Sequence, residues 1–155
     1  MAATVELALA KPADSVRIAA MSRDLVEAGL EWRWRSARVL KQILHPDVNV
    51  LAARANGSLV GFSIMHYHAE NAHLLLLAVN PALRRRSIGR SMVEWLEKPA
   101  RVAGIAHVQL EVRARNTISR QFYQALGYRE TQIIPNYYYG REAAVRMQHD
   151  LRVSV

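Results

Sequence analysis

The chain has 155 residues, of which 51% are hydrophobic, carries a formal net charge of +8 and contains no cysteine. We expect residues 1–155 to form a single domain, because this length and composition allow one full-sized core. The lack of cysteine excludes a disulfide framework, a thiolate nucleophile and zinc held by thiolates. No apolar run approaches the ~18 residues of a membrane span, and no signal-peptide pattern opens the chain. We therefore expect a cytoplasmic protein with no membrane partner.

The positive charge comes from eighteen arginines and three lysines spread along the chain. Such a surface can attract nucleic acid, a phosphorylated cofactor or an acidic substrate. A basic surface that is merely solvated would have the same composition, so charge alone leaves these alternatives open.

Hydrophobic periodicity and turn residues predict the elements of the first half of the chain. They are a strand at 4–10, helices at 12–29 and 33–44, and strands at 48–55, 58–67 and 74–79. Asn56-Gly57 is a strong signal for a two-residue hairpin turn. The uninterrupted apolar run at 74–79 predicts a strand that is buried on both faces.

The second half alternates helices and strands. The predicted elements are a helix that begins near Ile88 and ends or kinks at Pro99, a strand at 107–113, a helix at 117–126, and strands at 128–134 and 142–151. In the helix at 117–126, Ile118, Phe122 and Leu126 form the expected apolar ridge. The order predicts a mixed α/β domain with antiparallel hairpins and a βαβ half.

The segment between the strand at 74–79 and the following helix predicts an anion site. Loop N–H groups and the positive end of the helix dipole point to the same place. The cations of this segment are Arg84, Arg85, Arg86 and Arg90. The natural ligand for such a site is a phosphate or a pyrophosphate.

Two motifs in this part of the chain match a known family. Leu77-Ala78-Val79-Asn80-Pro81 followed by Arg84-x-x-Ser87-x-Gly89 resembles the acetyl-CoA pyrophosphate loop of the GNAT superfamily of N-acetyltransferases. Leu110-Glu111-Val112-Arg113-Ala114-Arg115-Asn116, followed by Phe122-Tyr123-Gln124-Ala125-Leu126-Gly127-Tyr128, resembles the second signature of that superfamily. The tail, with Asn136-Tyr137-Tyr138, is similar to the branch of bacterial ribosomal-protein alanine N-acetyltransferases.

The resemblance implies an α/β (α+β) GNAT fold, in which a mostly antiparallel sheet is splayed at the cofactor site and flanked by helices. It implies acetyl-CoA as co-substrate, held by Leu77, Ala78, Val79, Arg84, Arg85, Arg86, Ser87, Ile88, Gly89, Arg90, Asn116 and Tyr123. By this likeness the backbone at 77–79 pairs with the pantetheine arm. The N–H groups of 85–90 cradle the pyrophosphate, and Asn116 contacts the pantetheine region.

Ser87 stands where the superfamily usually has glycine. A serine with positive φ would cost on the order of 1 kcal/mol. A serine in helical or N-cap conformation would be harmless, and its hydroxyl could donate to phosphate. We expect the second conformation.

Glu111 and Tyr123 are the candidate catalytic residues. Acyl transfer to an amine needs a neutral amine and a stabilised leaving thiolate, and we assign Glu111 as general base and Tyr123 as general acid. Each has a structural alternative: Glu111 could be a surface partner of Arg113, and Tyr123 could be a packing residue. Asn116 could serve as the N-cap of the helix that follows it.

The sequence gives weaker signals for the residues that bind the acceptor amine. From the resemblance, we assign substrate binding to Trp32 and Arg35 between the N-terminal helices, and to Tyr137 and Tyr138 near the C-terminus. The segment with Trp32 and Arg35 could equally be a solvated helix edge, and one or two of the tyrosines at 137–139 could be packing residues. We expect no metal, because no second cluster of ligands supports His66, His68 and His73.

Three functions remain open. The first is acetyl transfer to a protein or peptide N-terminal α-amine, and the second is the same chemistry on a small amine. The third is a non-catalytic CoA- or nucleic-acid-binding regulatory protein. Because Glu111 and Tyr123 are both present, we expect an enzyme rather than a nucleic-acid-binding protein, as a monomer or a homodimer.

Overall fold

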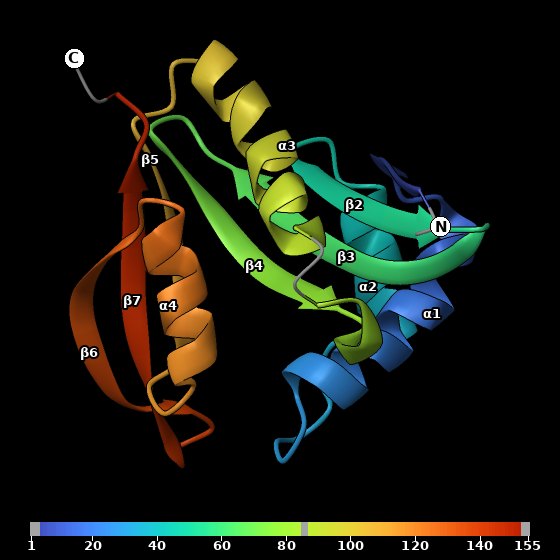
Figure 1. The fold of residues 1–155 in the computed structure, drawn as a ribbon. Helices are drawn as coiled ribbons and strands as arrows, with labels where there is room; N and C mark the ends of the chain where they lie inside the picture. Colours follow the sequence, from blue (N-terminus) through green and yellow to red (C-terminus); the bar gives the residue numbers. More distant parts are fainter. Residues whose placement is uncertain (1–3, 85–86, 153–155) are drawn as a thin grey trace. The chain divides into compact units, whose positions relative to one another are not determined.

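The protein is described by a computed structural model that covers residues 4–84 and 87–152. Its strands are β1 (Val5–Leu9), β2 (Val48–Ala55), β3 (Ser58–Tyr67), β4 (Asn71–Val79), β5 (His107–Arg113), β6 (Arg129–Tyr138) and β7 (Glu142–Asp150). Its α-helices are α1 (Ser15–Met21), α2 (Ser36–Ile43), α3 (Ile88–Val102) and α4 (Thr117–Ala125) (Figure 1). Short helical turns at Pro12–Asp14, Ser22–Val26 and Pro81–Leu83 complete the described elements. The element order agrees with the order predicted from the sequence.

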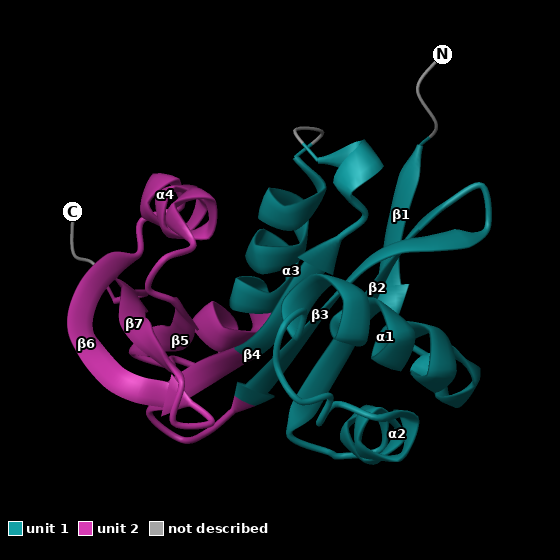
Figure 2. Cartoon of the chain, turned by 90° about the horizontal axis from the view of Figure 1, so that it is seen from below, with its two compact units in different colours: residues 1–66, 75–98 teal, residues 67–74, 99–155 magenta. Residues whose placement is uncertain are grey.

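The strands form one mostly antiparallel sheet in the order β1-β2-β3-β4-β5-β7-β6. The chain divides into two compact units, one of residues 1–66 and 75–98 and the other of residues 67–74 and 99–155 (Figure 2). Both β4 and α3 contribute residues to each unit. That residues 1–155 form a single domain stays a prediction.

The first unit contains the predicted β2–β3 hairpin. Asn56 and Gly57 both have positive φ (52° and 80°), and Ala55 pairs with Ser58. A two-residue turn with positive φ at both positions matches the right-handed twist of the flanking strands. The hairpin prediction is therefore confirmed.

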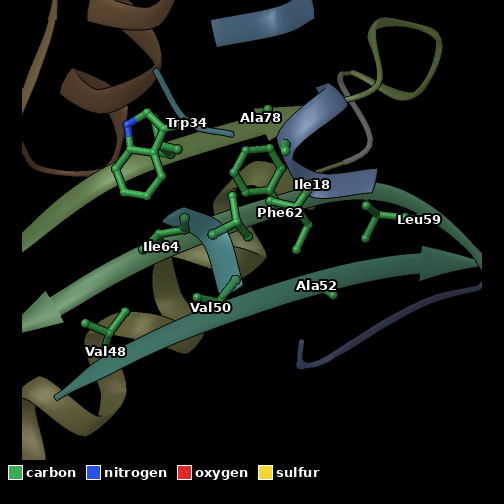
Figure 3. Packing of buried hydrophobic residues seen from close by; sticks show 12 residues of the cluster. Ile18, Trp34, Val48, Val50, Ala52, Leu59, Phe62, Ile64 and Ala78 are labelled. Carbon is green, nitrogen blue, oxygen red and sulfur yellow. The ribbon is translucent and has the colours of Figure 1, made fainter. Parts of the chain in front are cut away.

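The core of this unit fills the space between the sheet and the helices α1 and α2. Figure 3 shows Phe62 and Ile64 of β3 among side chains from β2, β4 and the helices. The fully or nearly buried members are Ile18, Ala19, Trp34, Val39, Val48, Val50, Ala52, Leu59, Phe62, Ile64, Leu76 and Ala78. Burying each large aliphatic side chain contributes about 1.5–3 kcal/mol, so this cluster holds the β4 strand in place.

The helix α3 covers the opposite face of strands β2, β3 and β4 in the same unit (Figure 1 and Figure 2). Gly61 of β3 permits close packing there. A Cβ atom on Gly61 would lie 2.9 Å from the Ala78 carbonyl oxygen and 3.4 Å from Cε of Met92. Any larger residue at Gly61 would push against the end of β4, where the predicted cofactor loop begins.

Pro99 lies inside α3 and does not end it, because α3 runs to Val102 and the Pro99 carbonyl accepts a hydrogen bond from Ala103 (3.0 Å). A kink at Pro99 stays a prediction, and the segment closes at Gly104, with φ 77°. One prediction about this region was wrong. The apolar run of β4 is not buried on both faces: Leu75 and Leu77 are half-buried, alternating with buried neighbours.

The N-terminal helical segment is also less regular than predicted. The turn at Pro12–Asp14, the helix α1 and the π-helical turn at Ser22–Val26 together replace one continuous helix. Helix α2 starts at Ser36 rather than at residue 33, since Arg35 is extended with ψ 167°. None of the helices within residues 4–84 and 87–152 is long and apolar enough to cross a membrane.

The second unit is built on β5, which pairs with β4 in parallel and with β7 antiparallel. The ladder with β4 covers Asn71–His73, which belong to the same unit. The short parallel ladder agrees with the expected open sheet.

Helix α4 packs in this unit through a residue outside the predicted ridge. Tyr123 is 7% exposed and Ile118 is 78% exposed. The ring of Tyr123 makes edge contacts with Phe122 (4.9 Å between centroids) and Tyr128 (5.6 Å). The predicted ridge was wrong because the ring of Tyr123, one position further along the helix, faces the sheet.

Candidate functional site

The predicted pyrophosphate loop lies in the first unit, between β4 and α3. Ala78 and Val79 are buried, and Leu77 is half-buried. After them, the Asn80 side chain accepts a hydrogen bond from the N–H of Ala82 (3.0 Å), which shapes the turn. The predicted residues Arg85 and Arg86 lie outside the described residues.

Ser87 has φ 61°, in the left-handed region, which contradicts the helical or N-cap conformation that we expected. Its carbonyl oxygen accepts the N–H of Ser91 (2.9 Å), so the first turn of α3 begins directly after it. The chain must change direction at this point, and positive φ achieves this at a cost of about 1–2 kcal/mol for a residue with a Cβ. This explains why glycine suits the position.

The start of α3 can attract an anion. Ile88 is buried and anchors the helix, whereas Arg84 and Arg90 are exposed. Arg90 makes an ion pair with Glu94, one turn along the helix (3.4 Å). Gly89 is half-buried, and an α-helix leaves its first N–H groups without intrahelical partners.

Glu111 lies on β5 in the second unit, and its carboxylate is surrounded by donors. Oε1 is 2.7 Å from Nε2 of His73 and 3.3 Å from the Tyr137 hydroxyl. Oε2 is 2.9 Å from Nε of Arg146 and 3.3 Å from Nε2 of Gln109. The side chain is only 5% exposed, so these contacts replace its hydration.

This environment keeps Glu111 ionised. Burial alone would raise the pKa of its carboxyl group, but the hydrogen bonds and charges of His73 and Arg146 lower it to about 2. The alternative that Glu111 is a surface partner of Arg113 was wrong. Arg113 pairs with Glu142 instead (3.5 Å), because its side chain lies near the far end of the β5–β7 ladder.

Tyr123 lies on α4 in the same unit. Burial raises the pKa of its phenol, so the group stays protonated at neutral pH. Tyr128, which makes the edge contact with Tyr123, also makes a tilted ring contact with His149 (5.0 Å between centroids). The phenol of Tyr123 therefore carries the proton that a general acid must have before it can donate one.

Asn116 is the N-cap of α4, as its structural alternative predicted. Its side-chain oxygen accepts the N–H of Ser119 (3.1 Å). The contact of Asn116 with the pantetheine region stays a prediction. The cap uses the side-chain oxygen of Asn116, so its amide nitrogen could make that contact.

Trp32 and Arg35 lie in the first unit, before α2. The Arg35 guanidinium lies 4.5 Å from the centre of the Trp32 ring, and the indole N–H donates to the carbonyl of Trp34 (3.1 Å). The buried Glu27 holds this segment, because its carboxyl oxygens accept the N–H groups of Arg33 (2.7 Å) and Trp34 (3.1 Å).

Tyr137 and Tyr138 lie at the end of β6, with ring centroids 4.9 Å apart. Tyr137 is 42% exposed and donates to Glu111, so the structure brings one residue assigned to the acceptor next to the residue assigned as base. Burial raises the pKa of both phenols, which stay neutral.

Three residues that matter here were missed from the sequence: Glu27, Arg146 and the pairing role of His73. Arg146 is opposite Glu111 only by the register of β5 and β7, and His73 reaches Glu111 from the parallel strand β4. Strand register is not visible in local periodicity. Among the described residues, no group of three or more histidine, aspartate or glutamate side chains could hold a metal ion.

The comparison with curated proteins finds a relative of known activity. Over 95 residues the chain is 37% identical to the [ribosomal protein bS18]-alanine N-acetyltransferase of Escherichia coli K12. That match covers 59% of this chain and 64% of the relative, so it spans less than two thirds of the relative's own length.

The fold agrees with solved structures over nearly the whole chain. The crystal structure of the ribosomal-protein-S18-alanine N-acetyltransferase from Escherichia coli superposes with a TM-score of 0.84 at 24% identity, covering 98% of this chain and 97% of that one. An N-acetyltransferase from Thermoplasma acidophilum, solved in complex with coenzyme A, gives a TM-score of 0.79 at 21% identity, covering 95% and 99%. The sequence profile of the Acetyltransferase (GNAT) family matches residues 18–128, and the chain therefore belongs to this family.

Proposed function

We propose that this protein transfers the acetyl group of acetyl-CoA to the α-amine at the N-terminus of a protein or peptide. One observation carries the proposal: the second unit holds a buried carboxylate, Glu111, which His73 and Arg146 contact at 2.7 and 2.9 Å, and a buried phenol, Tyr123. Acyl transfer from a thioester to an amine uses both kinds of group. The similarity to ribosomal-protein alanine N-acetyltransferases supports the choice of acceptor.

The cost of deprotonating the acceptor also favours an α-amine. An α-amine titrates near 8 and a lysine near 10.4, so at pH 7 the neutral form costs about 1.4 kcal/mol for the first and about 4.6 kcal/mol for the second. A site with one anionic group can offset the deprotonation cost of an α-amine more easily than that of a lysine.

The first unit offers a fitting site for acetyl-CoA. Arg84, Arg90 and the start of α3 supply positive charge and N–H donors for a pyrophosphate. The backbone N–H and C=O groups of Leu77, Ala78 and Val79 are assigned to the pantetheine arm, whose amides can form hydrogen bonds with strand backbone. The acetyl group supplied by this co-substrate is a thioester, which is already activated for attack.

In the proposed reaction the negative charge of Glu111 favours the loss of a proton from the amine, and Tyr123 gives a proton to the leaving thiolate. Two residues assigned to binding the acceptor are Trp32 in the first unit and Tyr137 in the second. Arg35, which is exposed, offers a cation for an acceptor carboxylate.

The proposal is tested in two steps. Acetyl-CoA at 100 times its Kd should stabilise the protein by about 2.7 kcal/mol, visible as a higher melting temperature. Release of CoA is then measured with peptides of different N-terminal residues and with a panel of small amines. Fast turnover with peptides supports the proposal, whereas turnover confined to small amines assigns the second function.

A stabilised protein with no turnover on any acceptor would indicate a CoA-binding regulatory protein. Binding of duplex DNA or RNA at low salt, weakening steeply as salt is added, would indicate a nucleic-acid-binding protein instead. The Tyr123→Phe variant is the matched control for the enzyme, because it should bind acetyl-CoA like the wild type and turn over slowly.

A further inference from the structure

The carboxylate of Glu111 has no capacity left for another donor. An ionised carboxylate offers about four lone-pair positions on its two oxygens. His73 and Tyr137 occupy those of Oε1, and Arg146 and Gln109 occupy those of Oε2. A water or an amine that approaches the site therefore finds the partners of Glu111 rather than a free carboxylate oxygen.

Only one of the four partners can take up a proton near neutral pH. The guanidinium of Arg146 and the amide of Gln109 have no basic lone pair. Tyr137 already donates its hydroxyl proton to Glu111, and burial and the nearby carboxylate raise the pKa of this phenol, so it stays a donor. Imidazole, in contrast, exchanges protons in the physiological range.

The contact between His73 and Glu111 fixes the tautomer of the imidazole. Because the carboxylate can only accept, Nε2 of His73 carries the hydrogen and donates it to Oε1 across 2.7 Å. The lone pair of the neutral ring is then on Nδ1, which makes no hydrogen bond to any residue that the structure describes. The His73 side chain is 29% exposed and that of Glu111 5%, so the histidine is the outer member of the pair.

We propose that His73 is the group that accepts the proton of the acceptor amine, through Nδ1, and that Glu111 is a positioning residue that orients and charges it. This inference rests on the proposed acetyl transfer and names the base for it. Hydrolases with a catalytic triad use the same arrangement: one ring nitrogen of the histidine accepts the proton, and the other donates a hydrogen bond to a carboxylate.

The protons balance as follows. The acceptor enters as an ammonium ion and leaves as an amide, so its nitrogen loses two protons. The first goes to Nδ1 of His73 and from there to solvent. The nitrogen lone pair then forms the bond to the acetyl carbon, and the carbon–sulfur bond breaks with its electron pair on sulfur. The thiolate takes the hydroxyl proton of Tyr123. The second proton that the nitrogen loses then reprotonates the Tyr123 oxygen.

The groups around the His73–Glu111 pair come from three strands. Glu111 and Gln109 lie on β5, Arg146 on β7 and Tyr137 on β6. Glu111 is anionic and Arg146 cationic, while Gln109 and Tyr137 are neutral. Glu111 lies at hydrogen-bond distance from the ring, so its loss should affect the orientation of His73 most.

The test compares His73→Gln with His107→Gln in the full-length protein. His107 lies on the same face of β5 as Glu111, four residues earlier, and makes a matched control. A general base must be unprotonated to act, so the plot of wild-type kcat/KM against pH should have an acidic limb, a decrease toward low pH that depends on His73. In His73→Gln this limb should disappear and kcat should drop by roughly 100-fold, within the usual contribution of a general base. His107→Gln should keep both the rate and the limb.

Exogenous imidazole provides a readout that a structural role would not move. His73→Gly should regain part of its turnover when imidazole is added, and His107→Gly should not respond. Wild-type rate and an unchanged acidic limb in His73→Gln would overturn the role of His73 while leaving acetyl transfer intact.

The tautomer can be measured without any acceptor. In ¹⁵N-labelled protein at pH 8, Nε2 of His73 should carry the hydrogen and Nδ1 should not, and Glu111→Gln should abolish this preference. A hydrogen on Nδ1 would overturn the inference. Failure of the wild type to acetylate any acceptor, in contrast, would overturn the proposed function from which the inference follows.

Discussion

Arg146 lies directly opposite Glu111 in the β5–β7 ladder, and its Nε atom donates a hydrogen bond of 2.9 Å to Oε2 of Glu111. With His73 on the other oxygen, two basic side chains hold one buried carboxylate. The same contacts that prepare the site for chemistry therefore also stabilise the fold, and this stabilisation depends on pH.

We expect Glu111→Gln to unfold more easily at pH 7 by about 3 kcal/mol. Glu111 has its pKa lowered from 4.5 to about 2, so the group contributes stability that is present above pH 4.5 and is lost as the pH falls toward 2. Urea unfolding of both proteins at several pH values measures the difference, which should shrink below pH 4.5. A gap that stays constant down to pH 2 would contradict this.

Glu130→Gln is the matched control for this experiment. Glu130 also pairs with an arginine, Arg120 (2.6 Å), but at the surface, where solvent screens the charges. Its replacement should change stability little at any pH.

Tyr123→Phe should lower kcat strongly and leave the stability and the affinity for acetyl-CoA close to wild type. Phenylalanine fills the same volume between Phe122 and Tyr128, and only the hydroxyl is lost. Stopped-flow measurement of CoA release, with isothermal titration for acetyl-CoA, separates the two effects. Phe122→Leu is a control that alters the same cluster without removing a hydroxyl. A wild-type kcat in Tyr123→Phe would reject Tyr123 as the acid.

Much of this fold could be predicted from the sequence because its signals are local. The Asn56-Gly57 turn and the alternation at 107–113 each specify their element within a few residues. The buried side of α4 could not be predicted this way, because Tyr123 and Ile118 are both compatible with an apolar face. Only the strands packed against the helix decide between them.

The candidate site shows the same division between local and long-range signals. Glu111 could be found from a motif, but its partners His73 and Arg146 lie 38 and 35 residues away in the chain. They meet Glu111 through the order β4-β5-β7, which no local pattern encodes. Ser87 was predicted wrongly for a related reason, since its φ is dictated by where β4 ends and α3 must begin.

Ser87→Gly should stabilise the protein by about 1 kcal/mol, because glycine adopts φ 61° without the steric cost of a Cβ. The affinity for acetyl-CoA should stay the same or improve. Ser91→Gly is the matched control: Ser91 is exposed in the first turn of α3, where glycine costs about 0.5 kcal/mol relative to serine. Thermal unfolding with and without acetyl-CoA distinguishes the two variants. A large loss of affinity in Ser87→Gly would mean that the hydroxyl contacts phosphate.

Glu27→Ala should loosen the segment before α2 and raise KM for the acceptor more than it lowers kcat. The buried carboxyl group of Glu27 accepts hydrogen bonds from the Ser22 hydroxyl (2.8 Å) and from the N–H groups of Arg33 and Trp34. Without it these donors lose their partner, at a cost of about 1–3 kcal/mol for each that stays buried. Tryptophan fluorescence should shift to longer wavelength as Trp34, now 8% exposed, meets water.

Glu31→Ala removes a neighbouring carboxylate that is 72% exposed and lies 3.6 Å from Arg33. Because a surface ion pair contributes little, this variant should keep the fluorescence and the KM of the wild type. Equal effects of the two variants would show that charge near Arg33, rather than the buried hydrogen bonds of Glu27, determines how the segment before α2 binds the acceptor. A raised KM confined to Glu27→Ala would instead place Trp32 and Arg35 in the acceptor site through the backbone that Glu27 holds.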